Sequence, residues 1–551
     1  MHTLRSYLPW QNFNEFFVSI VYFVQGSAGI TAIASALILR EEMGLDFYQI
    51  GLIGVAGTLP WSIKPVFGLL TDLVPIGMFR RKPYLHIGPL MGFLGYLGIA
   101  LYGNTFEGFF LCLIFANLGL SLTDVATDGF VVEESNDENV TRIQGLTQVS
   151  IRVAAFMTSF FSGLLIYAEI LTPHQMYLLA AGFPLITFAA SFYIREQSVE
   201  DWALLEPKTE DSMTLETTYE HYKTKKTDLQ VFTPGYIMAL IVIFVLIVTN
   251  LVFGQQLDDV IQGVIPGFSR TYFTVTIWLL FFVWMAGYFG KLVKLKLTTS
   301  MIFIAILFIL LWRFNPGTGA SMFFFVKDTL GIDEKTLGFM DTVAQIGSLL
   351  GVFLAVKIFD KIPLRTLLTM TVIVASAFGL TSFAVTRPEI GELLGNTALI
   401  GWAGMIIASP VYFFDSLFQY LIAGQEYVGA WAAVYQLSAM EKFLYAKSIV
   451  DELVFMIAYI PLLKLAVLIC PKRAEATNYA IIASIMNIGL ALSAWTSGFL
   501  YNTFMGWYHP GVDVSTVQVD VIELLIWVNV ITSLFCLFVI PFLKTDRFHK
   551  E

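Results

Sequence analysis

Two acidic residues, Asp124 and Asp128, lie one helical turn apart inside a long apolar run. At this i, i+4 spacing both carboxylates point to the same face of a helix, and two like charges this close favour a proton on one of them. The pair therefore has the chemistry of a proton carrier.

Two basic residues, Lys64 and Arg152, lie in neighbouring apolar runs. An ionised side chain in a membrane span costs roughly 2.5 to 3.5 kcal/mol on insertion scales, so it faces a cavity or a partner. At about 1.5 Å per residue, both basic residues reach a depth similar to that of Asp128. We expect Lys64, Asp124, Asp128 and Arg152 to form a network that binds an anionic or zwitterionic solute and couples its movement to a proton. The alternative is a static network that holds helices together.

A further basic residue, Arg313, precedes the sequence Asn315-Pro316-Gly317. Proline removes a backbone hydrogen bond and glycine loosens a helix, so we predict a broken span at this point. A guanidinium beside such a break can form a bidentate pair with a carboxylate. The alternative is an arginine that extends to the membrane interface.

The elements that position these charges are membrane helices. Of the 551 residues 57% are hydrophobic and 13% are charged, and the mean hydropathy is +0.73, which leaves too little polar surface for a soluble protein. The net charge of −10 argues against nucleic acid as a partner. We expect no cleavable signal peptide, because the amino terminus is polar and aromatic. Cys112, Cys470 and Cys536 are interpreted as buried apolar residues rather than as a disulfide framework.

Runs of about 20 apolar residues predict the membrane spans. In the first part of the chain these are 13–38, 46–71, 84–103, 107–132, 143–170 and 175–194. In the second part they are 234–254, 271–290, 297–326, 336–359, 363–386, 397–422, 448–470, 476–501 and 519–543.

The basic residues predict the orientation of these spans. They gather at one set of helix ends, which the positive-inside bias assigns to the cytoplasm. We therefore expect both termini to be cytoplasmic, in a multi-pass protein of the plasma membrane. The residues at these ends include Arg80, Arg81, Lys82, Lys291, Lys294, Lys361, Arg365, Lys472, Arg473, Lys544 and Arg547.

Several motifs resemble those of one transporter family. They are LPWSIKPVFGLLTD with the following RRKPYL, DVATDGFVVEE in the fourth span, GASMFFFVKDTLGI, and CPKRAEATNYAIIASIMNIG. Together they resemble the folate–biopterin transporter family of the major facilitator superfamily. The resemblance implies an all-α protein of two six-helix bundles that works by alternating access, with pteridines, folates or S-adenosylmethionine as cargo.

The chain is longer than that pattern requires. We assign residues 1–194 to the amino-terminal bundle, 195–233 to a cytoplasmic linker, 234–296 to an inserted helical hairpin and 297–551 to the carboxy-terminal bundle. The hairpin raises the expected number of crossings to about fourteen. A further insertion at 387–447 must cross twice or not at all, and we expect a helix followed by a re-entrant or surface segment.

The resemblance extends to smaller groups of residues. Gly68, Asp72, Arg80 and Arg81 resemble the superfamily's inner gating motif, in which an acid and a basic pair lock the cytoplasmic side. Gln25 and Asn487 are polar residues that can hydrogen-bond a pterin ring, and Trp495 can stack on it; packing is the alternative for each.

The sequence thus predicts a transporter rather than an enzyme. We find no phosphate-binding loop, no metal-ligand spacing and no nucleophile elbow, so we expect no cofactor or metal, and a gradient as the source of energy. The leading hypothesis is proton-coupled symport of folate-like or pterin-like solutes. The alternatives are a carrier of another small zwitterion, such as an amino acid or a nucleoside-like metabolite, and a non-transporting receptor. The oligomeric state is not predicted.

Overall fold

The computed structural model of the chain is helical throughout the part that it describes. The described residues are 10, 12–74, 76–77, 79–134, 140–196, 234–252, 270–294, 301–359, 362–422, 424, 426–469, 475–507 and 514–543. Within these ranges the only pairing of extended backbone is an isolated bridge between Ile76 and Phe79. Cys470 and all but the first two residues of the predicted linker at 195–233 lie outside them.

The first half of the fold comprises the helices before the linker. We call it the amino-terminal half. Its elements are α2 (Phe13–Gly26), η1 (Ser27–Thr31), α3 (Ala32–Leu37), η2 (Ile38–Glu42), α4 (Phe47–Ser62), α5 (Lys64–Leu73), α6 (Lys82–Tyr102), α7 (Phe106–Glu134), α8 (Val140–Tyr167) and α9 (Pro173–Ser191).

Two helices, α12 (Pro234–Val252) and α14 (Arg270–Lys294), pack on each other and also touch α7 and α15. The carboxy-terminal half follows them. Its elements are α15 (Met301–Arg313), α16 (Gly319–Phe324), η3 (Phe325–Thr329), α17 (Glu334–Phe359), α18 (Leu364–Gly379), η4 (Leu380–Ser382), α19 (Phe383–Thr386), α20 (Pro388–Gly395), α21 (Ala398–Leu421), α22 (Ala430–Tyr435), α23 (Ala439–Leu468), α24 (Glu475–Met505), α25 (Val514–Val539) and η5 (Ile540–Phe542).

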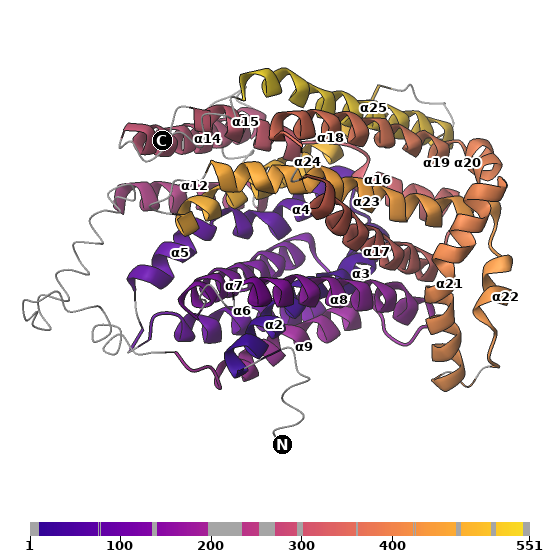
Figure 1. Cartoon of the computed structure of the whole chain (residues 1–551), viewed down its shortest axis with the longest axis horizontal. Coiled ribbons are helices and arrows are strands. Elements are labelled where there is room, and N and C mark those ends of the chain that lie inside the picture. The colour runs from indigo at the N-terminus through magenta and orange to yellow at the C-terminus, as the bar shows by residue number, and fades with distance from the viewer. Residues whose placement is uncertain are drawn as a thin grey trace, which may run out of the picture.

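The long helices of both halves run side by side (Figure 1). In that view the amino-terminal half lies below and the carboxy-terminal half above, and they meet where α4 packs on α24 and α8 packs on α17. Among the described residues, ten helical segments are long and apolar enough to cross a membrane. The chain is therefore an all-α, multi-pass membrane protein.

Two ends of this helix array are distinguished below. The α21 face is the end where α8 terminates and where α17 and α23 begin; it lies on the right in Figure 1. The linker face is the opposite end, where α9 terminates and α6 begins.

Glycines bring the two halves and their helices into close contact. A Cβ atom on Gly26 would lie 2.2 Å from the carbonyl oxygen of Ile151, and one on Gly51 would lie 2.7 Å from that of Ala494. Since these neighbours are backbone atoms, only glycine permits the observed spacing of the helices. Gly57 differs, because nothing lies within 4 Å of its Cβ position.

The insertion at 387–447 is helical in most of its described residues. Its apolar run forms α21, a short helix α22 follows, and α23 begins at Ala439 rather than at residue 448 as predicted. The earlier start has a local cause: the backbone N–H of Glu441 donates to Ser438 Oγ (3.1 Å) and the N–H of Ser438 donates to Glu441 Oε2 (2.7 Å). This reciprocal capping box begins the helix before the apolar run does.

Candidate functional site

A polar cluster lies inside the amino-terminal half, where three predicted residues meet. Lys64 Nζ forms a salt bridge with Asp124 Oδ2, and Gln25 Nε2 donates to the other oxygen of the same carboxylate. The side chains of Lys64 and Asp124 are only 16% and 5% exposed. A buried carboxylate is thereby neutralised and hydrogen-bonded on both oxygens, as low-dielectric surroundings require.

Two prolines place Lys64 at this position. Pro60 and Pro65 flank a break at Ile63, which separates α4 from α5, and Lys64 is the first residue of α5. The Lys64 ammonium also lies over the Trp61 ring, 4.9 Å from its centroid. The break thus turns a lysine into the interior and gives it both an anionic and an aromatic partner.

The same break provides a contact between the two halves. Pro65 has no N–H, so the carbonyl of Trp61, four residues earlier, lacks its usual helical donor. Asn487 Nδ2 of α24 donates to that carbonyl at 3.2 Å. Asn487, predicted as a ligand-binding residue, therefore lies beside the Lys64 cluster and is engaged with backbone.

Asp128 lies one turn further along α7, towards the linker face. Its carboxylate accepts a hydrogen bond from the Tyr22 hydroxyl, and its side chain is exposed although it lies within a membrane-spanning segment. Asp128 interacts electrostatically with Asp124, Lys64 and Arg81. Asp128 is therefore the more exposed of the two predicted acids, since Asp124 is buried.

The two predicted arginines converge on α23 instead. Arg152 Nη2 lies 3.8 Å from Met456 Sδ. Its guanidinium interacts electrostatically with Glu452 and Tyr459. Its Nε is buried and has no hydrogen-bond partner among the described residues. Arg152 therefore belongs to the interface between the halves, and the structure does not bring it to the Lys64 cluster.

Arg313 approaches the same face of α23 from the carboxy-terminal half. The span breaks after it, as predicted from Asn315-Pro316-Gly317, and α16 begins only at Gly319. Its Nε donates to the carbonyl of Met486 at 3.3 Å, and its guanidinium lies 5.6 Å from the centroid of the Tyr459 ring. Tyr459 thus has arginines from both halves beside it.

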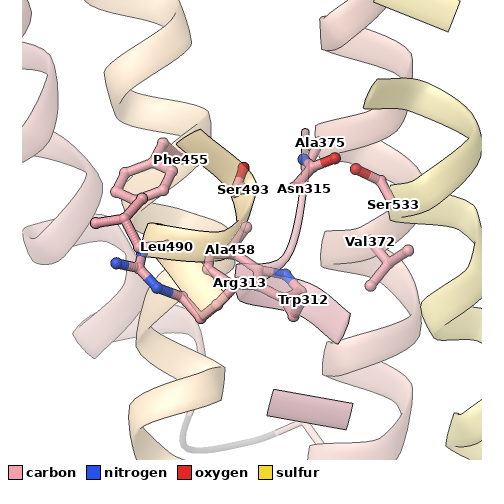
Figure 2. Close-up of a pocket in the computed structure, with 10 residues that line it drawn as sticks. All are labelled: Trp312, Arg313, Asn315, Val372, Ala375, Phe455, Ala458, Leu490, Ser493 and Ser533. Carbon is pink, nitrogen blue, oxygen red and sulfur yellow. The ribbon is translucent and has the colours of Figure 1, made fainter. Parts of the chain in front are cut away.

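Three aromatic rings gather beside these arginines, and the Trp312 and Phe455 centroids lie 6.0 Å apart. The Trp312 and Tyr459 rings stack at 5.9 Å, and Phe455 stacks on Tyr459 at 5.7 Å. Trp312, Arg313 and Phe455 line a cavity of about 230 Å³ together with Ser493. Figure 2 shows Arg313 extending towards Phe455, while Asn315 and Ser533 point towards each other on the other side. The ring cluster and the cavity offer stacking surfaces beside fixed positive charge.

A larger cavity of about 540 Å³ lies between the halves, nearer the α21 face. Ser35, Gly57 and Ser159 line it from the amino-terminal half, and Phe323 and Asp341 line it from the carboxy-terminal half. Ser159 Oγ donates to Asp341 Oδ2 at 2.5 Å, so one acidic residue faces this space.

The remaining predicted residues lie apart from these groups. Trp495 packs between Tyr48 and Phe499, near the α21 face. Gly68 lies in α5, 3.8 Å at its Cβ position from the Val125 side chain. The side chain of Asp72 lies outside the described residues.

The backbone of the predicted gating residues Arg80 and Arg81 is hydrogen-bonded to Glu196, which follows α9. The Glu196 carboxylate accepts from the backbone N–H groups of Arg80 (3.2 Å), Arg81 (2.8 Å) and Lys82 (2.8 Å), at the start of α6. The Arg81 side chain is buried against the backbone of Gly129 and donates to Thr71. These contacts tie α5, α6, α7 and the chain after α9 together at the linker face.

Several site residues were not singled out from the sequence. Asp341 and Glu452 are acids inside predicted spans, so the criterion that selected Lys64 also selects them. Tyr22 carries no comparable signal, because tyrosine is ordinary in an apolar helix. Among the described residues, no group of His, Cys, Asp and Glu side chains could hold a metal ion.

Comparisons with solved structures place this fold. The chain resembles a D-xylose–proton symporter at a TM-score of 0.55 and 12% identity, covering 97% of this chain and 98% of the other. It resembles a peptide transporter of the POT family at a TM-score of 0.55 and 14% identity, covering 98% and 96%. The chain therefore has the fold of these two transporters.

The sequence comparisons then specify the family. The model of the BT1 family matches residues 25–387 and 405–551, so this chain belongs to the BT1 family. It is 25% identical over 526 residues to the folate-biopterin transporter of Synechocystis sp., covering 95% of this chain and 79% of that protein. It is 22% identical over 494 residues to folate transporter 2 of Plasmodium falciparum, covering 88% and 80%.

Proposed function

We propose that this protein is a secondary transporter that moves folate-like or pterin-like solutes by alternating access between its two halves. Arg152 and Arg313, one from each half, both lie beside Tyr459 in a cluster of aromatic rings from α15 and α23, and this arrangement is the observation that carries the proposal. A folate or pterin is flat and aromatic, and folate also carries carboxylates, so it matches stacking rings beside paired guanidinium groups. The names of the two relatives are consistent with this cargo.

The second part of the proposal is coupling to protons. Asp124 has a permanent partner in Lys64, whereas Asp128 is exposed and hydrogen-bonded to a neutral tyrosine hydroxyl. Asp128 can therefore exchange a proton with water, whereas Asp124 is held in its salt bridge with Lys64. Asn487 of α24 hydrogen-bonds to the Trp61 carbonyl beside this cluster. This contact joins the two halves and must change when they move apart, so protonation of the nearby Asp128 can influence that movement.

The third part concerns topology. We propose two bundles of six crossings with α12 and α14 as two additional crossings, which gives fourteen, and both termini in the cytoplasm of a plasma-membrane protein. This number excludes α21, and an even number of crossings puts both ends of the chain on one side.

Uptake into proteoliposomes tests the cargo and the arginines. With an inward proton gradient, labelled folate should accumulate, and unlabelled pterins should compete better than amino acids or nucleosides. Arg313→Lys should raise the apparent KM for folate roughly 10-fold or more, because a charge-assisted hydrogen bond contributes about 1.5 to 3 kcal/mol. A pterin without a carboxylate should be affected less. Arg365→Lys, at an exposed position at the start of α18, is the matched control.

Two outcomes oppose the proposal. Equal competition by an amino acid or nucleoside would assign the site to another metabolite, and binding without flux would indicate a receptor.

Asp128→Asn should abolish pH-driven accumulation while leaving exchange of internal for external substrate. Unchanged dependence on the pH gradient in that folded variant would remove Asp128 from proton coupling.

A further inference from the structure

The helix α21 has the length and composition of a membrane span but a different direction. It contains 24 residues and is apolar enough to cross a membrane. In Figure 1 it runs at a steep angle to the other long helices, along the right-hand end of the molecule.

Its contacts show this direction independently. A Cβ on Gly404 would lie 2.1 Å from the carbonyl of Lys442, the fourth residue of α23. Further along α21, Tyr412 packs on Phe339, the sixth residue of α17, at a ring distance of 5.4 Å.

The next contacts lie on α8, in the other half. Phe414 and Phe418 of α21 pack on Phe160 and Phe161, which precede the end of α8 at Tyr167 by about two turns. From Gly404 to Phe418 a helix rises about 21 Å. The contact points on α23, α17 and α8 nevertheless remain within a few residues of the same depth. A crossing helix would move along its neighbours by a similar distance, so α21 lies across them.

The outward side of α21 is a continuous apolar and aromatic stripe. Leu399, Trp402, Ile406, Phe413 and Tyr420 are exposed at intervals of three, four and seven residues, which is one face of a helix. Trp431 and Tyr435 of the adjacent α22 are exposed as well.

The inward side of α21 carries its acidic residue. Asp415 is buried and pairs with Lys335 of α17 at 3.4 Å. The helix is therefore amphipathic, as helices at a membrane surface are: its charged residue faces the protein and its apolar face points away from it.

We propose that α21 is an interfacial helix that lies in the plane of the membrane at the α21 face, with its stripe in the boundary between phospholipid headgroups and acyl chains. Its contacts lie about 5 to 10 Å inside the ends of the helices it crosses, which is the depth of this boundary. Exposed tryptophan and tyrosine are the residues that favour it. In this position α21 covers the seam between α8 and α17, where the two halves meet, and it does not cross the bilayer.

Spin labels at single cysteines test the proposal in full-length protein in phosphatidylcholine–phosphatidylglycerol nanodiscs, with Cys112, Cys470 and Cys536 replaced. Labels at Trp402, Ile406, Phe413 and Tyr420 should share one depth near the phosphates, measured from collisions with oxygen and with a water-soluble nickel reagent. Exposed positions on α25, Trp527, Ile531 and Phe538, serve as the matched control. Their depths should shift by about 16 Å in total at 1.5 Å per residue.

Each alternative gives a distinct result. A steady change of depth from residue 402 to residue 420 would mean that α21 crosses the membrane and would overturn the proposal. Labels shielded from both reagents would place a second protein copy on the stripe and would overturn it as well. Retained elution volume and folate uptake in each variant exclude misfolding as the cause.

Discussion

At the scale of residues, the ion pair of Lys64 and Asp124 can act either in stabilising the fold or in transport, and substitutions distinguish the two roles. Removing one partner leaves the other charge buried, which costs about 3 to 5 kcal/mol, so Lys64→Met and Asp124→Leu should each lower the melting temperature of the purified protein. The double variant should recover most of the loss, because no unpaired charge remains. Thermal unfolding in detergent measures this, and equal or additive losses in the double variant would contradict a pair.

The same double variant decides between the two interpretations of the cluster. If it folds but takes up no folate, Lys64 and Asp124 act on cargo or protons. If it folds and transports normally, the pair is a static connection between α5 and α7.

At the scale of elements, the packing of α4 on α24 depends on Gly51. A Cβ there would lie 2.7 Å from the carbonyl oxygen of Ala494, and backbone cannot yield as a side chain does. Gly51→Ala should therefore destabilise the protein by about 1 to 3 kcal/mol, the usual cost of overpacking, and should lower its melting temperature. Gly57→Ala on the same helix is the control, since nothing lies within 4 Å and alanine favours helix. Equal stability of both variants would mean that the helices are not in contact at Gly51.

The elements also show what the sequence could and could not predict. The break at Asn315-Pro316-Gly317 was predictable because proline and glycine act on the local backbone. The direction of the Arg152 side chain was not predictable, because the rotation of a helix depends on the partners that pack on it. The Ser438–Glu441 capping box was readable in the sequence, yet nearby charges lowered the hydropathy and moved the expected start of α23.

The direction of α21 was beyond prediction for a similar reason. Length and apolarity state only that a helix prefers the bilayer to water, and they do not state its tilt. The contacts that fix it, Phe414 on Phe160 and Phe418 on Phe161, join segments more than 250 residues apart.

At the scale of the whole molecule, Lys327 connects the two halves at the α21 face. It forms salt bridges with Glu41 of the amino-terminal half and with Glu334 of α17, the latter at 3.4 Å. Lys327→Gln should shift the population towards opening at this face. Electron–electron distances between spin labels at the exposed positions Tyr102 and Leu393 should lengthen. Lys447→Gln is the control, because its partners Asp451 and Thr381 belong to the same half, and a similar lengthening there would contradict the assignment.

The pH dependence of this connection follows from the lysine. Burial lowers the pKa of Lys327, but the hydrogen bonds and attraction of Glu41 and Glu334 outweigh it and raise its pKa above the ordinary value. A raised lysine pKa gives a contribution that is complete below about pH 10 and is lost only as pH rises above it. Across neutral pH the lysine keeps its charge, so the label distances in the unmodified protein should not respond to its titration between about pH 6 and pH 9.

The missing N–H of Pro65 has one more consequence. A helix that bends normally loses a backbone hydrogen bond when it bends. Here the Trp61 carbonyl has no donor within its own helix and accepts a hydrogen bond from the Asn487 side-chain amide instead. When the halves part, water can replace that amide at little enthalpic cost, because a water-mediated hydrogen bond is nearly as favourable as a direct one. The second span thus carries a ready-made flexure point whose adjustment requires hydration rather than the rupture of secondary structure.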